Sequence, residues 1–318
     1  MNVLIGYPNV GKSNILEALS LFQIGNIADI DVRSFLRFEN YVNLFYNNSF
    51  SNNILVKLDD TEKIEIKLKN KQLHIKSESK KMFFEVEVPL NNYWINAMEH
   101  VSKTSDDYDA LERIQIKKYS FHGNQKEQSL GLSRELNSPY GENIADVINV
   151  HEDLKKDIIG IFKDYNLKYG TDENNKIRIV KEYENQEVKI FPYIQIADTI
   201  QRLIFYKASI FSNNNSVLLF EEPEAHMFPP YISKFTTDII FDKNNNQYFI
   251  TTHSPFVVNE FIEEIQNELS VYVVDYDKGE TIIKRLTDEE LTEIAQFGID
   301  LFFNLEAYLD KYGQPHST

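Results

Sequence analysis

The chain has 318 residues, of which 42% are hydrophobic and 13% aromatic, and it carries 11 glycines and 9 prolines. This composition is typical of a folded globular protein and excludes extensive disorder. The absence of cysteine excludes disulfides and thiolate metal sites, and a net charge of −16 disfavours general binding to nucleic-acid backbones. No apolar stretch reaches the roughly 18 to 20 residues that span a bilayer, and no signal segment opens the chain, so we expect a cytoplasmic protein without a membrane role.

A glycine-rich segment follows the first apolar run of the chain, Val3-Leu4-Ile5, and reads Gly-Tyr-Pro-Asn-Val-Gly-Lys-Ser. This spacing is typical of a phosphate-binding loop, in which glycines allow backbone N–H groups to surround phosphates. Lys12 is expected to neutralise the outer phosphate, and the Ser13 hydroxyl to ligate Mg²⁺. The sequence thus predicts a nucleoside triphosphate site formed by Gly6, Asn9, Val10, Gly11, Lys12, Ser13 and Asn14.

The first half of the chain predicts a helix, a β-meander and a second lobe. Residues 14–22 carry apolar side chains at helical spacing, so a helix is expected to start at the phosphate loop. Alternating polar and apolar residues predict antiparallel strands at 54–58, 63–68, 73–75 and 83–88. Residues 91 to about 165 are expected to be mainly helical and irregular, with apolar residues at helical spacing over 146–149 and 154–162.

The second half alternates helix and strand patterns. It predicts a helix over 199–211, strands at 217–220 and 248–251, a hairpin of 269–274 with 281–283, and two short helices after Thr287. Such alternation around a phosphate loop indicates an α/β fold with a mostly parallel sheet and the nucleotide at the strands' carboxyl ends. We expect one head over 1–318, in which 1–90 and 191–318 form the nucleotide-binding lobe and 91–190 an inserted, mainly helical lobe.

Charged side chains follow the two apolar strands of this second half. Glu221 and Glu222 end the first strand before Pro223, and His253 follows the second. Glu221 suits an outer-sphere partner of Mg²⁺, and Glu222 suits a catalytic base that orients the attacking water. His253 could donate to the γ-phosphate or to that water. The alternatives are two surface glutamates and a structural histidine.

Three segments together carry a family resemblance: GYPNVGKSN, VLLFEEPEAHMFPP and FITTHSPFVVNE. They resemble the ABC-type ATPase heads of the SMC, RecF and OLD group, which includes ATPase subunits of bacterial antiphage systems. The resemblance implies a P-loop NTPase head that binds ATP and dimerises around two ATP molecules, each held between one subunit's phosphate loop and the partner's signature motif. No heptad repeat predicts the coiled-coil arm of some related ATPases.

The sequence departs from these heads at three places. One is that no glutamine-bearing loop follows the first helix, and Arg33, Arg37 and Asn43 in that region have no assigned role. The stretch matching the signature motif, Ile196 to Arg202, lacks the usual serine and glycine. Thr199 could supply the hydroxyl that contacts the partner's nucleotide or, with Asp198, cap a helix, while Arg202 could be a packing or salt-bridge residue. Met1 begins directly at the phosphate-loop strand, which indicates either a truncated start or a bare sheet edge.

The leading functional hypothesis is an ATP-hydrolysing head that dimerises, or forms a larger homo-oligomer, and gates a separately encoded effector such as a nuclease in antiphage defence. One alternative is a scaffold or sensor that binds ATP and hydrolyses it poorly. Another is a DNA-repair head that clamps duplex DNA. The Asp275-x-Asp277 pair could be mistaken for nuclease metal ligands, but its sequence, Asp-Tyr-Asp-Lys-Gly, predicts a hairpin turn.

Overall fold

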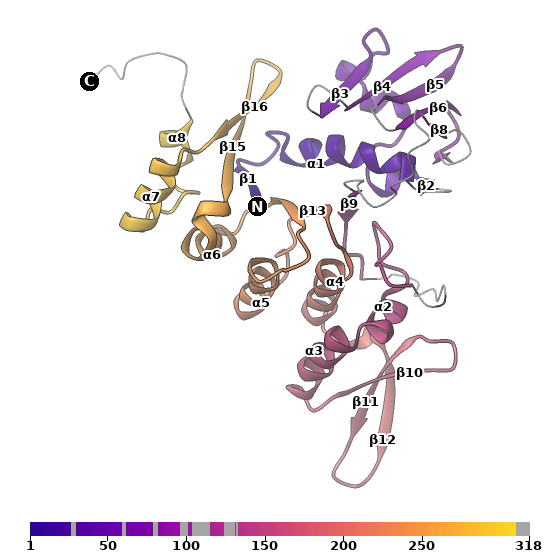
Figure 1. The fold of residues 1–318 in the computed structure, drawn as a ribbon, viewed down its shortest axis with the longest axis vertical. Helices are drawn as coiled ribbons and strands as arrows, with labels where there is room; N and C mark the ends of the chain where they lie inside the picture. Colours follow the sequence, from indigo (N-terminus) through magenta and orange to yellow (C-terminus); the bar gives the residue numbers. More distant parts are fainter. Residues whose placement is uncertain are drawn as a thin grey trace. The chain divides into compact units, whose positions relative to one another are not determined.

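The computed structural model describes residues 1–26, 30–58, 62–78, 82–95, 101–103, 115–123, 131 and 133–309. The chain divides into two compact units, one of residues 1–13 and 119–318, the other of residues 14–118. Figure 1 follows the chain through both units, from indigo at the N-terminus to yellow at the C-terminus. These units divide the chain at different places from the lobes expected from the sequence, whose boundaries lay after residues 90 and 190.

A six-stranded sheet with the order β16-β15-β1-β14-β13-β9 forms the centre of the fold. Its strands are β1 (Asn2–Gly6), β9 (Gln115–Tyr119), β13 (Ser216–Glu221), β14 (Gln247–Thr251), β15 (Ser270–Asp277) and β16 (Glu280–Arg285). The β1, β13, β14 and β15 pairings are parallel, and β16 is antiparallel to β15. The predicted mostly parallel sheet is therefore confirmed. Because β1 lies between β14 and β15, it is not a bare sheet edge.

Helices of the second half of the chain belong to the first unit. They are α4 (Asp198–Ser212), α5 (Pro229–Ile240), α6 (Pro255–Ile265), α7 (Asp288–Phe297) and α8 (Leu305–Tyr308), with short 3₁₀ helices at Tyr193–Gln195 and Gln266–Glu268. In Figure 1, α4, α5 and α6 lie in a row, and α5 contacts both neighbours. Tyr206 of α4 lies 5.2 Å from Phe220 of β13 and 5.5 Å from Phe235 of α5, measured between ring centroids. These buried aromatic rings fix β13, and with it the acidic residues that follow.

Residues 144–192 add two helices and a small sheet to the first unit. The elements are α2 (Ile144–Val150), α3 (Glu152–Lys163), β10 (Lys168–Thr171), β11 (Ile177–Glu182) and β12 (Val188–Pro192), and the strands form an antiparallel sheet. Both helices were predicted, but the three strands were not. Ile177 and Ile179 of β11 are buried while their neighbours are less so, which is the alternation that a strand requires.

The second unit contains the predicted meander. Its five-stranded antiparallel sheet has the order β3-β4-β5-β6-β8, formed by β3 (Ile54–Leu58), β4 (Glu62–Lys69), β5 (Gln72–Glu78), β6 (Met82–Pro89) and β8 (Val101–Lys103). A second small sheet pairs β2 (Ile30–Asp31) with β7 (Trp94–Ile95). The helical segments are most of α1 (Lys12–Ser20) and the 3₁₀ helices Leu21–Asn26, Val32–Ser34, Tyr41–Leu44 and Tyr46–Asn48.

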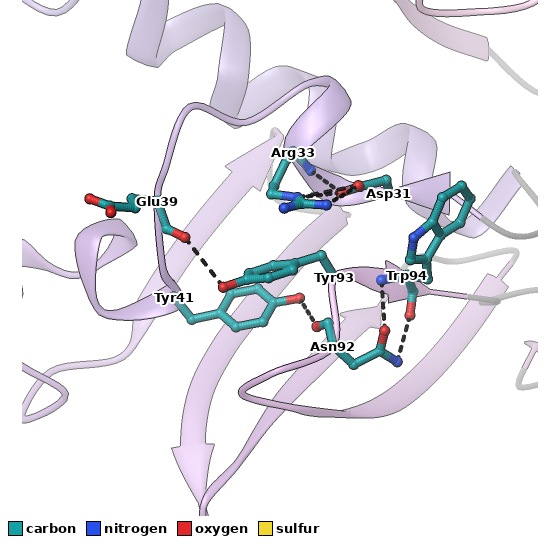
Figure 2. A network of polar contacts seen from close by, with 7 residues as sticks. All are labelled: Asp31, Arg33, Glu39, Tyr41, Asn92, Tyr93 and Trp94. Atoms are coloured by element: carbon teal, nitrogen blue, oxygen red, sulfur yellow. Dashed lines mark hydrogen bonds and ion pairs between the residues drawn. The ribbon is translucent and has the colours of Figure 1, made fainter.

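Aromatic rings and polar groups tie β2 and β7 to the segment between them (Figure 2). The Arg33 guanidinium lies 4.2 Å from the centre of the Tyr93 ring, and its Nε donates to Asp31 Oδ1 at 3.0 Å. The Tyr41 hydroxyl donates to the carbonyl oxygen of Asn92 at 2.8 Å, and burial raises the pKa of Tyr41. Arg33, which the sequence left without a role, thus contributes to local structure.

Candidate nucleotide-binding site

The loop between β1 and α1 has a backbone that only glycine accommodates at two points. Gly6 and Gly11 have φ angles of 153° and 100°, and a Cβ on either would lie 2.2 Å from an oxygen of the β15–β16 hairpin. The oxygen near Gly6 is the carbonyl of Val274, and the one near Gly11 is the hydroxyl of Thr281. Asn9, with φ of 64°, is a third residue of positive φ in the loop. The loop is thus a narrow cradle in which any side chain at position 6 or 11 is sterically excluded.

Lys12 stands at the first position of α1 and is buried. Its ammonium donates to the carbonyl oxygens of Gly6 and Tyr7 at 2.9 and 2.8 Å, so it lies over the loop. Burial lowers the pKa of Lys12, and the Glu222 carboxylate opposes this shift. Ser13 and Asn14 follow in the first turn of the helix. An ammonium, the exposed N–H groups of a helix start and a glycine cradle are groups that fit a phosphate.

The two acids occupy the end of β13 as predicted. Glu221 is the last residue of β13, and the backbone of Glu222 turns into the left-handed region with φ of 42°. The Glu222 N–H donates to the carbonyl oxygen of Thr251 at 3.0 Å, which holds the turn against the end of β14. A glutamate in this conformation is uncommon and costs on the order of 1 kcal/mol, which the surrounding contacts must offset.

His253 lies next to Glu222, with 3.4 Å between His253 Nε2 and Glu222 Oε1. Burial lowers the pKa of His253, the Lys12 charge lowers it further, and Glu222 opposes both. Each of these three side chains therefore acts electrostatically on the others. The structure brings together Lys12, Glu222 and His253, which the sequence predicted would converge from separate segments.

Glu224 is a residue of this region that sequence reasoning missed. Its Oε1 accepts from the Thr252 hydroxyl at 2.6 Å and from the His253 N–H at 3.0 Å. Among the described residues, its buried Oε2 has no hydrogen-bond partner, and burial raises the pKa of Glu224. The carboxyl group thus connects the loop after β13 to the loop after β14. Its only sequence signal was a third acid two positions after Glu222.

Thr199 and Arg202 lie on α4, where the signature-like stretch was expected. The N-cap of the helix is Ala197, without a side-chain hydrogen bond, so the alternative in which Thr199 and Asp198 cap the helix is wrong. The Thr199 hydroxyl instead donates to the carbonyl oxygen of His226 at 3.1 Å. Arg202 Nε donates to Asp198 at 2.7 Å and its guanidinium lies 4.7 Å from the centre of the Phe121 ring. Arg202 is therefore a packing and salt-bridge residue.

The acidic pair at 275 and 277 belongs to the hairpin. Asp275 and Asp277 lie on β15, and Lys278 and Gly279, with φ of 47° and 94°, form the two-residue turn to β16. Positive φ at both central residues is the geometry of a tight hairpin turn. The predicted hairpin is confirmed, but the prediction that its turn includes Asp275 to Asp277 is wrong, because β15 continues to Asp277.

Comparison with known proteins assigns the chain to a family. Residues 1–259 match the family model described as "AAA domain, putative AbiEii toxin, Type IV TA system". The chain belongs to this family. No curated protein matches the sequence. The matched range of this AAA domain includes the phosphate loop, the acid pair and His253, whereas the β15–β16 hairpin lies beyond it.

The AAA domain is also similar to solved heads of SMC proteins. One is an SMC head bound to the C-winged helix domain of ScpA, with 11% identity, a TM-score of 0.49 and 92% of each chain covered. Another is the Pyrococcus furiosus head with an extended coiled coil bound to the C-terminal domain of ScpA, with 11% identity, a TM-score of 0.46, and 93% of this chain and 92% of that chain covered. A third, from Thermotoga maritima, has 10% identity, a TM-score of 0.39 and 90% of each chain covered.

Proposed function

We propose that this AAA domain binds ATP with Mg²⁺, hydrolyses it, and uses nucleotide state to control its assembly and a separately encoded effector in antiphage defence. The observation that supports ATP hydrolysis is that Lys12, Glu222 and His253 lie close together. The Glu222 carboxylate lies 3.4 Å from the His253 imidazole and interacts electrostatically with Lys12. A cation, a base and a second proton carrier at one phosphate cradle are the groups that phosphoryl transfer to water requires.

Each residue has a separate part in this proposal. The loop N–H groups and Lys12 hold the phosphates, while the Glu222 carboxylate accepts a proton from the attacking water. His253, whose lowered pKa favours its neutral form near pH 7, orients that water or the γ-phosphate. The Ser13 hydroxyl and Glu221 would hold Mg²⁺, which supplies positive charge to the phosphate oxygens when bound.

Steady-state ATP hydrolysis by the wild type and by Glu222→Gln tests the enzymatic part. We expect the variant to bind ATP but to lose about a hundredfold or more in turnover, because the amide cannot act as a base. Glu263→Gln, an exposed carboxylate on α6, is the matched control and should hydrolyse ATP like the wild type. Equal background rates for the wild type and Glu222→Gln would eliminate hydrolysis.

A specific observation favours the second candidate, a nucleotide-gated scaffold that hydrolyses ATP poorly. The signature-like stretch lacks serine and glycine, and the Thr199 hydroxyl already donates to His226. A weak contact with the partner's nucleotide would slow hydrolysis without preventing ATP binding. Tight ATP binding with background turnover in the wild type would support this function.

Dimerisation and effector control rest on the family resemblance and need their own tests. Light scattering of Glu222→Gln with saturating Mg²⁺–ATP should give twice the monomer mass, and an unchanged mass would contradict ATP-dependent pairing. For the effector, cells that express the gene with its genomic neighbours should resist phage, whereas the same cassette with Lys12→Ala should not. Equal plating on both would contradict a defence role that depends on ATP.

A further inference from the structure

The phosphate loop is supported from one side by the β15–β16 hairpin. The Cα of Gly6 faces the Val274 carbonyl on β15, and the Cα of Gly11 faces Thr281 on β16, both too closely for a Cβ. The Thr281 hydroxyl also donates to the carbonyl oxygen of Val10 at 2.9 Å. Residues 270–285 therefore contact the beginning and the end of the loop.

The bond to Val10 fixes a neighbouring donor. A trans peptide is planar, and its C=O and N–H point in opposite directions. The Val10 carbonyl and the Gly11 N–H belong to one peptide, so a carbonyl held toward Thr281 turns the Gly11 N–H away from the hairpin. The φ of 100° at Gly11 shows that the adjacent torsion is one that glycine alone adopts readily.

Other carbonyls of the loop are held as well. Those of Gly6 and Tyr7 accept from Lys12, so the Val10 carbonyl depends on a different donor. If this peptide flipped, a carbonyl oxygen would replace an N–H on the inner side of the loop, and a carbonyl repels a phosphate. The Thr281 hydroxyl, 271 positions away in the sequence, opposes that flip through its hydrogen bond to the Val10 carbonyl.

We propose that Thr281 is a positioning residue for nucleotide binding, which holds the Gly11 N–H in the orientation that receives a phosphate oxygen. The inference rests on the proposed ATP binding and adds to it a residue from outside the region that matches the AAA family. Thr281 acts through the backbone of the loop and does not itself contact the nucleotide.

Calorimetric titration of the full chain with Mg²⁺–ATP tests the proposal. Thr281→Val keeps the shape but removes the donor, so we expect the dissociation constant to rise about three- to tenfold, the effect of one neutral hydrogen bond. Thr281→Ser keeps the hydroxyl and should restore affinity to within about twofold of the wild type. Thr292→Val is the control, because the Thr292 hydroxyl donates to a carbonyl oxygen of its own helix at 2.7 Å, and its affinity should not change.

A spectroscopic readout separates this role from a loss of fold. With ¹⁵N-glycine labelling, the 11 glycines give a simple amide spectrum. The Gly11 signal should move or broaden in Thr281→Val and keep its position in Thr281→Ser. Wild-type affinity with an unmoved Gly11 signal in Thr281→Val would overturn the inference while ATP binding stands. Failure of the wild type to bind ATP would overturn both.

Discussion

Glu222 combines an uncommon backbone conformation with a position beside His253, and Glu224 holds the two loops that carry them. Glu224 Oε1 accepts from both Thr252 and His253, so this buried carboxyl group controls where the histidine backbone lies. Burial has a cost for a carboxylate, which is why the pKa of Glu224 is raised. Glu224, which was not predicted from the sequence, thus contributes to the geometry of Glu222 and His253, which were.

Glu224→Gln should therefore change how stability depends on pH. A raised pKa means that the folded state binds the proton more tightly, so the wild type loses stability as pH rises above about 4.5 and through the raised value. Glutamine keeps an oxygen for both bonds and removes the charge, so its stability relative to the wild type should increase across this range. Urea unfolding at acidic and neutral pH measures the difference.

Glu224→Ala provides the comparison. It removes the acceptor of both hydrogen bonds, so we expect a loss of about 1–3 kcal/mol in the free energy of unfolding at acidic pH. This loss should shrink as pH rises, because alanine also removes the carboxyl group whose ionisation destabilises the wild type. If glutamine and alanine have the same effect, the hydrogen bonds of Glu224 do not stabilise the two loops.

Lys12→Ala should strongly weaken nucleotide binding and leave the fold intact. The ammonium is the charge placed over the phosphate loop, and its loss should weaken ATP binding by about a hundredfold, as measured by calorimetry. Lys243→Ala, at an exposed position between α5 and β14, is the matched control. Wild-type affinity in Lys12→Ala would remove Lys12 from the site.

At the scale of elements, the contact between β1 and β15 leaves no room at the end of β1. Gly6→Ala would place a Cβ 2.2 Å from the Val274 carbonyl, a backbone atom that cannot rotate away, so we expect a loss of about 3 kcal/mol in unfolding free energy. Gly298→Ala is the control, because Gly298 also has positive φ, 60°, but no atom within 4 Å of the added Cβ. It should cost about 1 kcal/mol. Equal losses in urea unfolding would mean that crowding by β15 does not matter.

The elements that could be predicted from the sequence are those with a strong local pattern. β1, β13 and β14 each contain a run of apolar residues, and the residues expected at the phosphate site lie at the ends of these strands. The same local pattern therefore predicted the strands and indicated where to look for the site residues. β10 to β12 escaped prediction because they are short strands beside two amphipathic helices, and the helical pattern was extended over them. The role of Thr281 could not be predicted, since its partner is 271 positions away and a threonine in a strand has no local signal.

For the whole molecule, charge is the property that most constrains partners. With a net charge of −16, we predict no saturable binding of duplex DNA to the protein without nucleotide at physiological salt, as measured by fluorescence anisotropy. Among the described residues, no helix has the length and apolar character needed to cross a membrane. DNA binding that appears only with ATP and weakens steeply with salt would favour the DNA-repair alternative.

The position of β1 within the sheet has a consequence for biosynthesis. The ribosome makes the phosphate loop long before β14, β15 and Thr281, yet β1 pairs with both strands and the Val10 carbonyl in its loop accepts a hydrogen bond from Thr281. A nascent chain must therefore keep β1 unpaired until β14 has been made, and its loop remains without the Thr281 hydrogen bond until the hairpin follows. Competence to hold a triphosphate is thus acquired only after the β15–β16 hairpin has been made, so ATP itself would distinguish a polypeptide that includes this hairpin from one that stalled before it.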